Sequence, residues 1–341
     1  MTSREIVCRT LTFGGPERLA MSLPPPYPND LCFKGPGPDP RHPATDWRQA
    51  APGRWESTDE WGNTWARLEG ISKGEVSRGV LDDWSRLNDI ELPDYDLPER
   101  YDGARKVFGD RPDMFKVGVL PGFPFSIARY MRRLDNFLAD VLIEPEKTSR
   151  LLEMVEEQVH HAIRRLAEAG ADAVMCAEDW GTQDRLLVSP AVWQRMFKPG
   201  FQRLCRTAHE RGVFVIIHSC GYVYEAMEGM LEAGINVFQF DQPELYGVER
   251  LAEEFGGRTT FWCPVDIQKT LQTRDACRIE GAAKRMVERL GARGGGFIAG
   301  HYGSNEAIGL EPKWQDIACR AFVKYGAPDL WRTLEKQLPD A

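Results

Sequence analysis

From about residue 114 onward, short apolar runs alternate with longer amphipathic segments. Each run is rich in β-branched or aromatic residues and is bounded by Gly, Pro or polar residues, which is typical of a buried parallel strand. We expect strands at residues 115–120, 173–176, 213–217, 237–240, 260–263 and 297–299.

The segments between these runs have helical periodicity, and we expect helices at 144–170, 189–212 and 222–234. In the first of them Pro145 suits the opening turn and Gly170 suits the C-cap. Repeated strand–helix alternation predicts a parallel sheet with right-handed crossovers. Six such units, with weaker strand candidates near 19–23 and in a tryptophan-rich region, predict an α/β fold of the (β/α)8 TIM-barrel type. An open doubly wound sheet is the alternative, but no glycine-rich phosphate loop follows any strand.

The first hundred residues have a different composition. Prolines crowd residues 24–40 and disfavour regular helix or central strand there. Five tryptophans follow between residues 47 and 84, and the run 61–65 has the Gly and Asn of a hairpin turn. We therefore expect residues 1–110 to be an irregular Pro/Trp-rich N-terminal extension. It would pack on residues 111–341, the main part of the barrel, as one structural domain overall.

Length and charge narrow the functional classes. The chain has 341 residues, 42% of them hydrophobic, which suits a single α/β barrel with an extension. Its net charge of −8 argues against a nucleic-acid partner, which would require a basic face. The sequence contains no run of 18 apolar residues, so we expect no membrane span. The N-terminus lacks the apolar core of a secretion signal. We therefore expect a cytoplasmic protein.

Polar side chains follow five consecutive predicted strands. In α/β barrels the active site lies where the strands end, so we expect a pocket for a small-molecule substrate at this rim. Asp179 and Asp241 are candidate catalytic acids or bases, although a carboxylate after a strand can equally cap the next helix. The candidate substrate-binding residues at the same strand ends are Glu178, Trp180, Gln242, Asp266, Gln268 and Tyr302.

His218 and Cys220 form the most specific pair at this rim. Residues two apart on a strand point to the same side, and imidazole nitrogen and thiolate sulfur are both good zinc ligands. A catalytic site needs a third ligand, for which His301, Cys263 and the carboxylates of Glu178 and Asp179 are candidates. The alternative is that both side chains line the core with satisfied hydrogen bonds.

The chain also resembles a known superfamily at these positions. The resemblance covers nearly its whole length, through TSRE at 2–5, DEWG at 59–62, DWGT at 179–182, IHSCG at 217–221 and GGFIA at 295–299. These segments are similar to those of the uroporphyrinogen decarboxylase-like superfamily. The resemblance implies a distorted α/β barrel with its pocket at the carboxyl ends of the strands.

That superfamily contains two well-known kinds of enzyme. True uroporphyrinogen decarboxylases hold the substrate carboxylates with an arginine-rich motif near the N-terminus, whereas residues 23–40 here contain no arginine. Methyltransferases that work with corrinoid proteins instead carry H-x-C on one strand and a further cysteine near the last strand, which together bind zinc. His218 and Cys220 match that pair, and His301 stands where the last cysteine is expected, so the resemblance implies a zinc site formed by His218, Cys220 and His301.

The resemblance to this branch therefore implies a Zn²⁺-assisted methyltransferase. It would move a methyl group between a corrinoid and a small acceptor or donor, such as a thiol, a folate or a methylated substrate. The chain carries no corrinoid-binding module, so the corrinoid would be bound to a separate protein. The alternatives are a metal-independent decarboxylase or other lyase acting on a smaller acid, and a barrel that only binds a ligand.

Overall fold

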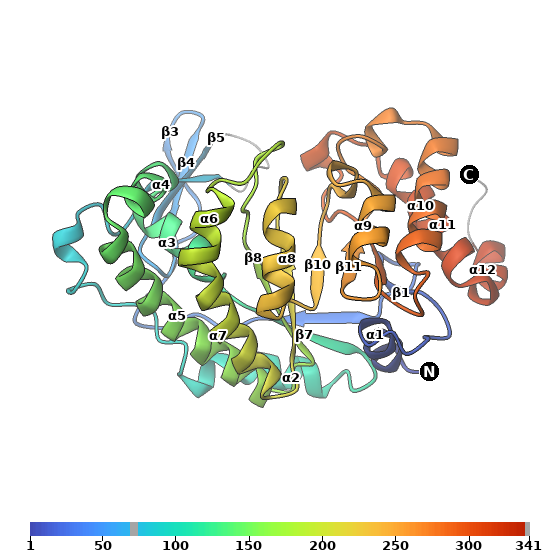
Figure 1. Cartoon of the computed structure of the whole chain (residues 1–341), viewed down its shortest axis with the longest axis horizontal. Helices are drawn as coiled ribbons and strands as arrows, with labels where there is room; N and C mark the ends of the chain where they lie inside the picture. Colours follow the sequence, from blue (N-terminus) through green and yellow to red (C-terminus); the bar gives the residue numbers. More distant parts are fainter. Residues whose placement is uncertain (69–73, 338–341) are drawn as a thin grey trace.

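The computed structural model of the protein describes residues 1–68 and 74–337. Eight parallel strands form one sheet in the order β1-β12-β11-β10-β9-β8-β7-β2, and helices surround it as a nearly closed (β/α)8 barrel (Figure 1). The prediction of a barrel is thus confirmed. The strands are β1 (Ala20–Ser22), β2 (Leu31–Lys34), β7 (Phe115–Val119), β8 (Ala173–Ala177), β9 (Phe214–His218), β10 (Val237–Gln239), β11 (Thr260–Cys263) and β12 (Phe297–Gly300).

Seven of the eight strands lie where the apolar pattern places them. The six runs after residue 114 form β7 to β12, and the weak candidate near 19–23 forms β1. The eighth candidate, in the tryptophan-rich region, is wrong, because the strand is β2 in the proline-rich segment. β2 lies at one end of the sheet order, where a short strand near prolines is tolerated because it needs ladder hydrogen bonds on one side only.

Between β1 and β2 the barrel is joined by side chains as well as by backbone. Ser22 and Asn29 form an isolated antiparallel bridge. The buried Asp30 carboxylate accepts hydrogen bonds from Arg18 at 2.8 and 2.6 Å, from the Met21 amide at 2.8 Å and from the Ser3 hydroxyl at 2.6 Å. One carboxylate therefore ties the start of β2 to β1 and to the first helix.

The tryptophan-rich segment is regular rather than irregular, which corrects the sequence-based description of the extension. It forms a separate antiparallel sheet of β3 (Arg48–Ala51), β4 (Arg54–Thr58), β5 (Thr64–Leu68) and β6 (Glu75–Arg78). The predicted hairpin is confirmed between β4 and β5, where Asp59 accepts hydrogen bonds from Asn63 and Trp65. The division of the chain at residue 110 stays a prediction, and two barrel strands precede it.

The three predicted helices are confirmed. Residues 144–170 form α5 (Pro145–Glu168), and residues 222–234 form α8 (Tyr224–Ala233). Residues 189–212 contain α6 (Pro190–Val192), a π-helix (Trp193–Phe197) and α7 (Lys198–His209). The other α-helices are α1 (Ser3–Leu11), α2 (Asp102–Gly109), α3 (Pro124–Arg132), α4 (Leu134–Ile143), α9 (Val248–Phe255), α10 (Ala276–Leu290), α11 (Pro312–Gly326) and α12 (Pro328–Leu334).

Apolar side chains fill the inside of the barrel from one end. Ile6, Val7 and Leu11 of α1 pack with a cluster to which every barrel strand contributes. The other members of that cluster are Ala20, Leu31, Phe115, Val117, Ala173, Ile216, Val237, Trp262 and Ile298. Because this packing fills the interior, an active site would have to lie at the carboxyl ends of the strands. Among the described residues, no helix combines the length and the apolar character that crossing a membrane requires.

Candidate functional site

Three side chains from two neighbouring strand ends converge at the barrel mouth. Possible ligand atoms of Asp179, His218 and Cys220 all lie within 4.8 Å of one another. The Cys220 Sγ lies 3.3 Å from His218 Nε2, which is itself 3.7 Å from Asp179 Oδ1. The predicted pairing of His218 and Cys220 on one side is thus observed, and Asp179 joins them.

Two glycines allow this approach. Gly221 has φ +76°, and a Cβ built on it would lie 2.2 Å from the Gly181 carbonyl oxygen. A Cβ on Gly181 would in turn lie 2.5 Å from the Tyr222 nitrogen. The loops after β8 and β9 therefore touch backbone to backbone. This contact accompanies a hydrogen bond of 2.9 Å from the Cys220 amide to Asp179 Oδ1.

The imidazole of His218 is held from its other side. Its Nδ1 is hydrogen bonded to Gln239 Oε1, and Gln239 Nε2 donates to Asp241 Oδ1 at 2.9 Å. These partners leave Nε2 of His218 facing Cys220 and Asp179. Asp241, which the sequence predicts to be catalytic, is thus linked to the imidazole through Gln239, by two successive hydrogen bonds.

Cys220 is an exposed residue, but the surrounding protein covers part of its thiol. Loss of hydration from the surrounding protein raises its pKa to about 12, and the charges of Asp179 and Asp241 add to the rise. The thiol is therefore protonated at neutral pH in the free protein, and a bound cation would be required to generate the thiolate.

Arg129 is a member of the site that sequence reasoning missed. It comes from α3, and its Nη2 lies 3.6 Å from Asp179 Oδ2 while its Nη1 donates to the Asp179 carbonyl at 3.3 Å. Its Nε is buried and has no hydrogen-bond partner within the described part of the chain. In the sequence, Arg129 is only an arginine in a helix that follows a barrel strand. Many surface arginines lie in the same kind of position, so the sequence alone does not single it out.

Glu178 and Trp180 are turned away from the mouth, into the core. Glu178 is fully buried and accepts hydrogen bonds from the Ser126 amide and from Trp180 Nε1, each at 2.9 Å. Burial raises the pKa of Glu178 to about 8. Trp180 is also fully buried and stacks on Phe125, with ring centroids 3.7 Å apart. In this structure neither residue is placed to contact a substrate at the mouth.

Of the other predicted residues, Asp266 has a structural role in its own loop. Asp266 is buried and accepts hydrogen bonds from the backbone amides of Glu244, Gln268 and Lys269, which is a capping role. The side chain of Gln268 itself is exposed. Gln242 is buried, and its Oε1 has no partner among the described residues.

His301 and Tyr302 follow the last strand. His301 Nδ1 lies 3.0 Å from the Ser22 carbonyl oxygen, and His301 is not in the group that Asp179, His218 and Cys220 form. Tyr302 is half-buried. Burial is the main cause that raises the pKa of its hydroxyl, and the Asp241 carboxylate adds to the rise.

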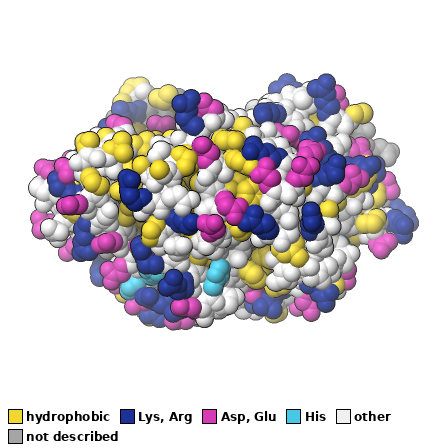
Figure 2. Space-filling model, viewed as in Figure 1, with side chains coloured by type: hydrophobic (Ala, Val, Ile, Leu, Met, Phe, Trp, Pro, Cys, Tyr) yellow, Lys and Arg dark blue, Asp and Glu magenta, His cyan; other side chains and the backbone are white. Residues whose placement is uncertain are grey.

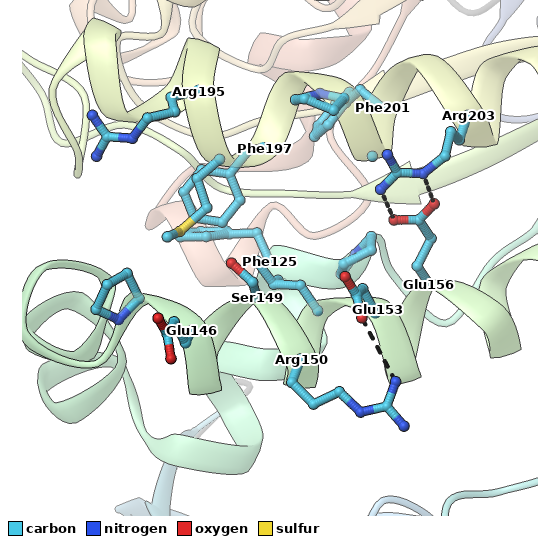
Figure 3. A pocket seen from close by; sticks show the side chains of 16 residues that line it. Phe125, Glu146, Ser149, Arg150, Glu153, Glu156, Arg195, Phe197, Phe201 and Arg203 are labelled. Atoms are coloured by element: carbon cyan, nitrogen blue, oxygen red, sulfur yellow. Dashed lines mark hydrogen bonds and ion pairs between the residues drawn. The ribbon is translucent and has the colours of Figure 1, made fainter.

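A cavity of about 590 Å³ lies outside this donor group, between α5 and the π-helix with α7. Figure 3 shows Phe125 and Phe197 between the two helices, with Arg195 and Arg150 toward its sides and the Arg203–Glu156 ion pair at one end. Phe125 also stacks on Trp180, so this cavity and the strand-end loop share one aromatic wall. In Figure 2 the molecule is indented at its upper edge, above the region of β8 and β10 in Figure 1.

Comparison with known proteins shows the family of the chain. The family model described as uroporphyrinogen decarboxylase (URO-D) matches residues 72–313, which is well over half of the chain. Uroporphyrinogen decarboxylases from two strains of Thermus thermophilus are each 32% identical over 126 residues, which are 35% of this chain. The match spans only 36% of the length of each of those relatives.

A solved methyltransferase from Methanosarcina mazei has the same fold. Its TM-score is 0.57 at 18% identity, with 77% of this chain and 73% of that chain covered. At this identity the likeness concerns the fold. The matched segment 72–313 contains all three residues of the donor group. The chain belongs to the uroporphyrinogen decarboxylase family.

Proposed function

We propose that the protein is a zinc-dependent methyltransferase that moves a methyl group between a corrinoid, carried on a separate protein, and a small acceptor or donor. The observation that carries this proposal is the convergence of Asp179, His218 and Cys220 within 4.8 Å at the barrel mouth. The acceptor or donor would be a thiol, a folate or a methylated small molecule.

The donor set suits zinc. Imidazole nitrogen, thiolate sulfur and carboxylate oxygen are its usual protein ligands, and three of them leave one position open for catalysis. His218 Nε2, Cys220 Sγ and a carboxylate oxygen of Asp179 would hold the metal. Bound there, it would supply the positive charge that lowers the pKa of a ligated or substrate thiol and activates it for nucleophilic transfer.

The side chains around this group have roles that do not depend on the metal. Arg129 neutralises part of the Asp179 charge and gives the mouth a cation. Asp241, which follows β10, and Tyr302, which follows β12, would bind the polar part of a substrate or exchange a proton with it. With a thiol acceptor, the thiol would first lose its proton to solvent. The thiolate sulfur would then bond to the methyl carbon of the methyl-corrinoid substrate as the carbon–cobalt bond breaks, and the electron pair of that bond would stay on cobalt.

Metal analysis tests the proposal directly. The purified protein should contain about one equivalent of zinc, and Cys220→Ser or His218→Gln should lose it while remaining folded by circular dichroism. Cys277→Ser is the matched control, since that exposed cysteine lies on α10, away from the donor group. A folded wild-type protein with zinc at background level, even after addition of Zn²⁺, would remove the mechanism.

A metal-independent decarboxylase of a smaller acid is the second candidate. It is favoured by family membership and by Arg129, whose guanidinium at the mouth could pair with a substrate carboxylate. That enzyme would keep full activity in a strong chelator, whereas the proposed methyltransferase would lose it and recover it with Zn²⁺.

A further inference from the structure

His218 ends a chain of hydrogen bonds that starts at a carboxylate. Asp241 Oδ1 accepts from Gln239 Nε2 at 2.9 Å, and Gln239 Oε1 is hydrogen bonded to His218 Nδ1. Gln239 is 8% exposed, and it is the last residue of β10, paired in register with His218 of β9. The backbone hydrogen bonds between β9 and β10 therefore hold Gln239 next to His218.

The chemistry of each group sets the direction of every bond. An ionised carboxylate only accepts hydrogen bonds, so Gln239 must present its NH2 group to Asp241. The carbonyl oxygen of the same amide then faces His218 and can only accept. The imidazole must therefore donate from Nδ1, and in the neutral ring Nε2 carries the lone pair.

The reverse arrangement would be unfavourable. A His218 with its proton on Nε2 would need a donor at Nδ1, so the Gln239 amide would have to turn over. Its carbonyl oxygen would then face the Asp241 carboxylate, with two acceptors in contact and a buried polar group unsatisfied.

We infer that Gln239 and Asp241 are positioning residues that hold His218 as its Nδ1–H tautomer, with the Nε2 lone pair aimed at Cys220 and Asp179. A neutral histidine in water favours the opposite tautomer, so this state is a property that the protein imposes. Partners of this kind orient metal-binding histidines and typically change metal affinity by roughly 10–100-fold. Only that consequence rests on the proposed zinc site.

Nitrogen-15 NMR of the metal-free protein tests the tautomer itself. The chain has six histidines, and the His218 signals are identified by their loss in His218→Gln. At a pH where the ring is neutral, the wild type should show Nδ1 protonated and Nε2 unprotonated. Gln239→Met should shift His218 toward Nε2–H, and Asp241→Ala should do so in part, because the Gln239 amide is then free to turn.

Two further variants separate this role from general damage. Gln239→Glu keeps an acceptor at Nδ1, and a proton on its other oxygen would replace the amide N–H that faces Asp241, so it should retain the Nδ1–H state. Gln158→Met is the matched control. Gln158 lies on α5 and accepts a hydrogen bond from the Tyr95 amide, so its replacement should leave the His218 tautomer unchanged. A wild-type His218 in the Nε2–H state, or an Nδ1–H state that survives in Gln239→Met, would overturn the inference.

Zinc affinity is measured separately on the same variants. Gln239→Met should bind Zn²⁺ roughly 10–100-fold more weakly than the wild type, with Gln239→Glu close to the wild type. If the tautomer result holds and no variant binds zinc, the proposed function fails and the positioning role stands. Zinc binding that is unchanged in a Gln239→Met protein with the altered tautomer would remove the role in metal binding.

Discussion

Asp179, and not His301, lies beside His218 and Cys220 in this structure. We therefore predict that Asp179→Asn weakens zinc binding by more than the roughly 10–100-fold that follows loss of an outer partner, because the substitution removes a carboxylate that we propose as a direct ligand. The new amide keeps an oxygen for the Cys220 backbone N–H, so the loop should remain in place. Competition against a chromophoric chelator measures the affinity.

His301→Asn is the matched comparison for that measurement. It removes a histidine whose Nδ1 contacts the Ser22 carbonyl, and it should change zinc affinity little. A large loss in His301→Asn together with normal binding in Asp179→Asn would mean that the mouth rearranges around the metal, with His301 as the third ligand that the family resemblance implies.

Which residues reach the mouth could be predicted only in part. The i, i+2 spacing of His218 and Cys220 placed both on one side, as observed. Glu178 and Trp180 are the sequence neighbours of Asp179, yet both are buried against α3, where Glu178 accepts from the Ser126 amide and Trp180 stacks on Phe125. The path of the loop after β8, where Gly181 contacts Gly221, determines which side chains face the mouth. This contact joins residues forty positions apart, so the local sequence does not show it.

At the scale of elements, the contact between the loops after β8 and β9 has a testable consequence. Gly221→Ala places a Cβ 2.2 Å from the Gly181 carbonyl and also requires an L-residue at φ +76°. The loops must separate, so we expect zinc affinity to fall and the free energy of unfolding to drop by more than the ~1–2 kcal/mol of left-handed backbone strain alone.

Gly212→Ala isolates the backbone term of that prediction. Gly212 has φ +68°, and a Cβ there meets nothing within 4 Å. This variant should lose only about 1–2 kcal/mol in urea unfolding and keep its zinc. If both variants behave alike, the close approach of the two loops does not hold the site.

The pairing of α5 with α7 predicts a pH dependence of stability. Burial would raise the pKa of the Glu156 carboxyl, but hydrogen bonds from Arg203, at 2.6 and 2.7 Å, and from His160 outweigh it and lower the pKa below its usual value. Because the carboxyl pKa is lower in the folded protein, ionised Glu156 stabilises the fold. This contribution is fully present at pH values above the unfolded carboxyl pKa of about 4.3. That stabilisation is lost as pH falls through the folded value.

Urea unfolding of Glu156→Gln at neutral pH and near pH 3 measures this term. The variant should be less stable than the wild type at neutral pH, and the difference should shrink on the acidic side. Glu157→Gln is the control, since Glu157 is exposed on the same helix, and its effect should stay small at both values. A deficit in Glu156→Gln that grows with acidity would have the wrong sign.

Which elements could be predicted follows from how they are buried. Strands covered on both faces, such as β9 and β11, leave continuous apolar runs that the sequence shows directly. β2 and the antiparallel strands β3 to β6 lie at an edge or outside the barrel and have exposed residues, so their pattern is weak. The hairpin was recognised only because its turn contains Gly and Asn.

For the whole molecule, closure of the barrel depends on the junction between β1 and β2. In the described part of the chain, one isolated bridge joins Ser22 of β1 to Asn29, which precedes β2, so side chains must contribute to the junction. The Asp30–Arg18 pair does this with side chains that are 1% and 19% exposed. Removing one partner of a buried pair leaves a charge without compensation, which typically costs about 3–5 kcal/mol.

We therefore predict that Asp30→Asn lowers the free energy of unfolding by about that amount, although it changes only one atom and keeps an acceptor for the Met21 amide. Glu228→Gln is the comparison, since its pair with Arg258 is about half exposed on both sides and should contribute less than about 1 kcal/mol. Denaturant unfolding of both variants gives the two numbers. Equal, small effects would show that the α1 and strand packing closes the barrel without the buried pair, whereas a large loss in Asp30→Asn alone would assign closure to the junction.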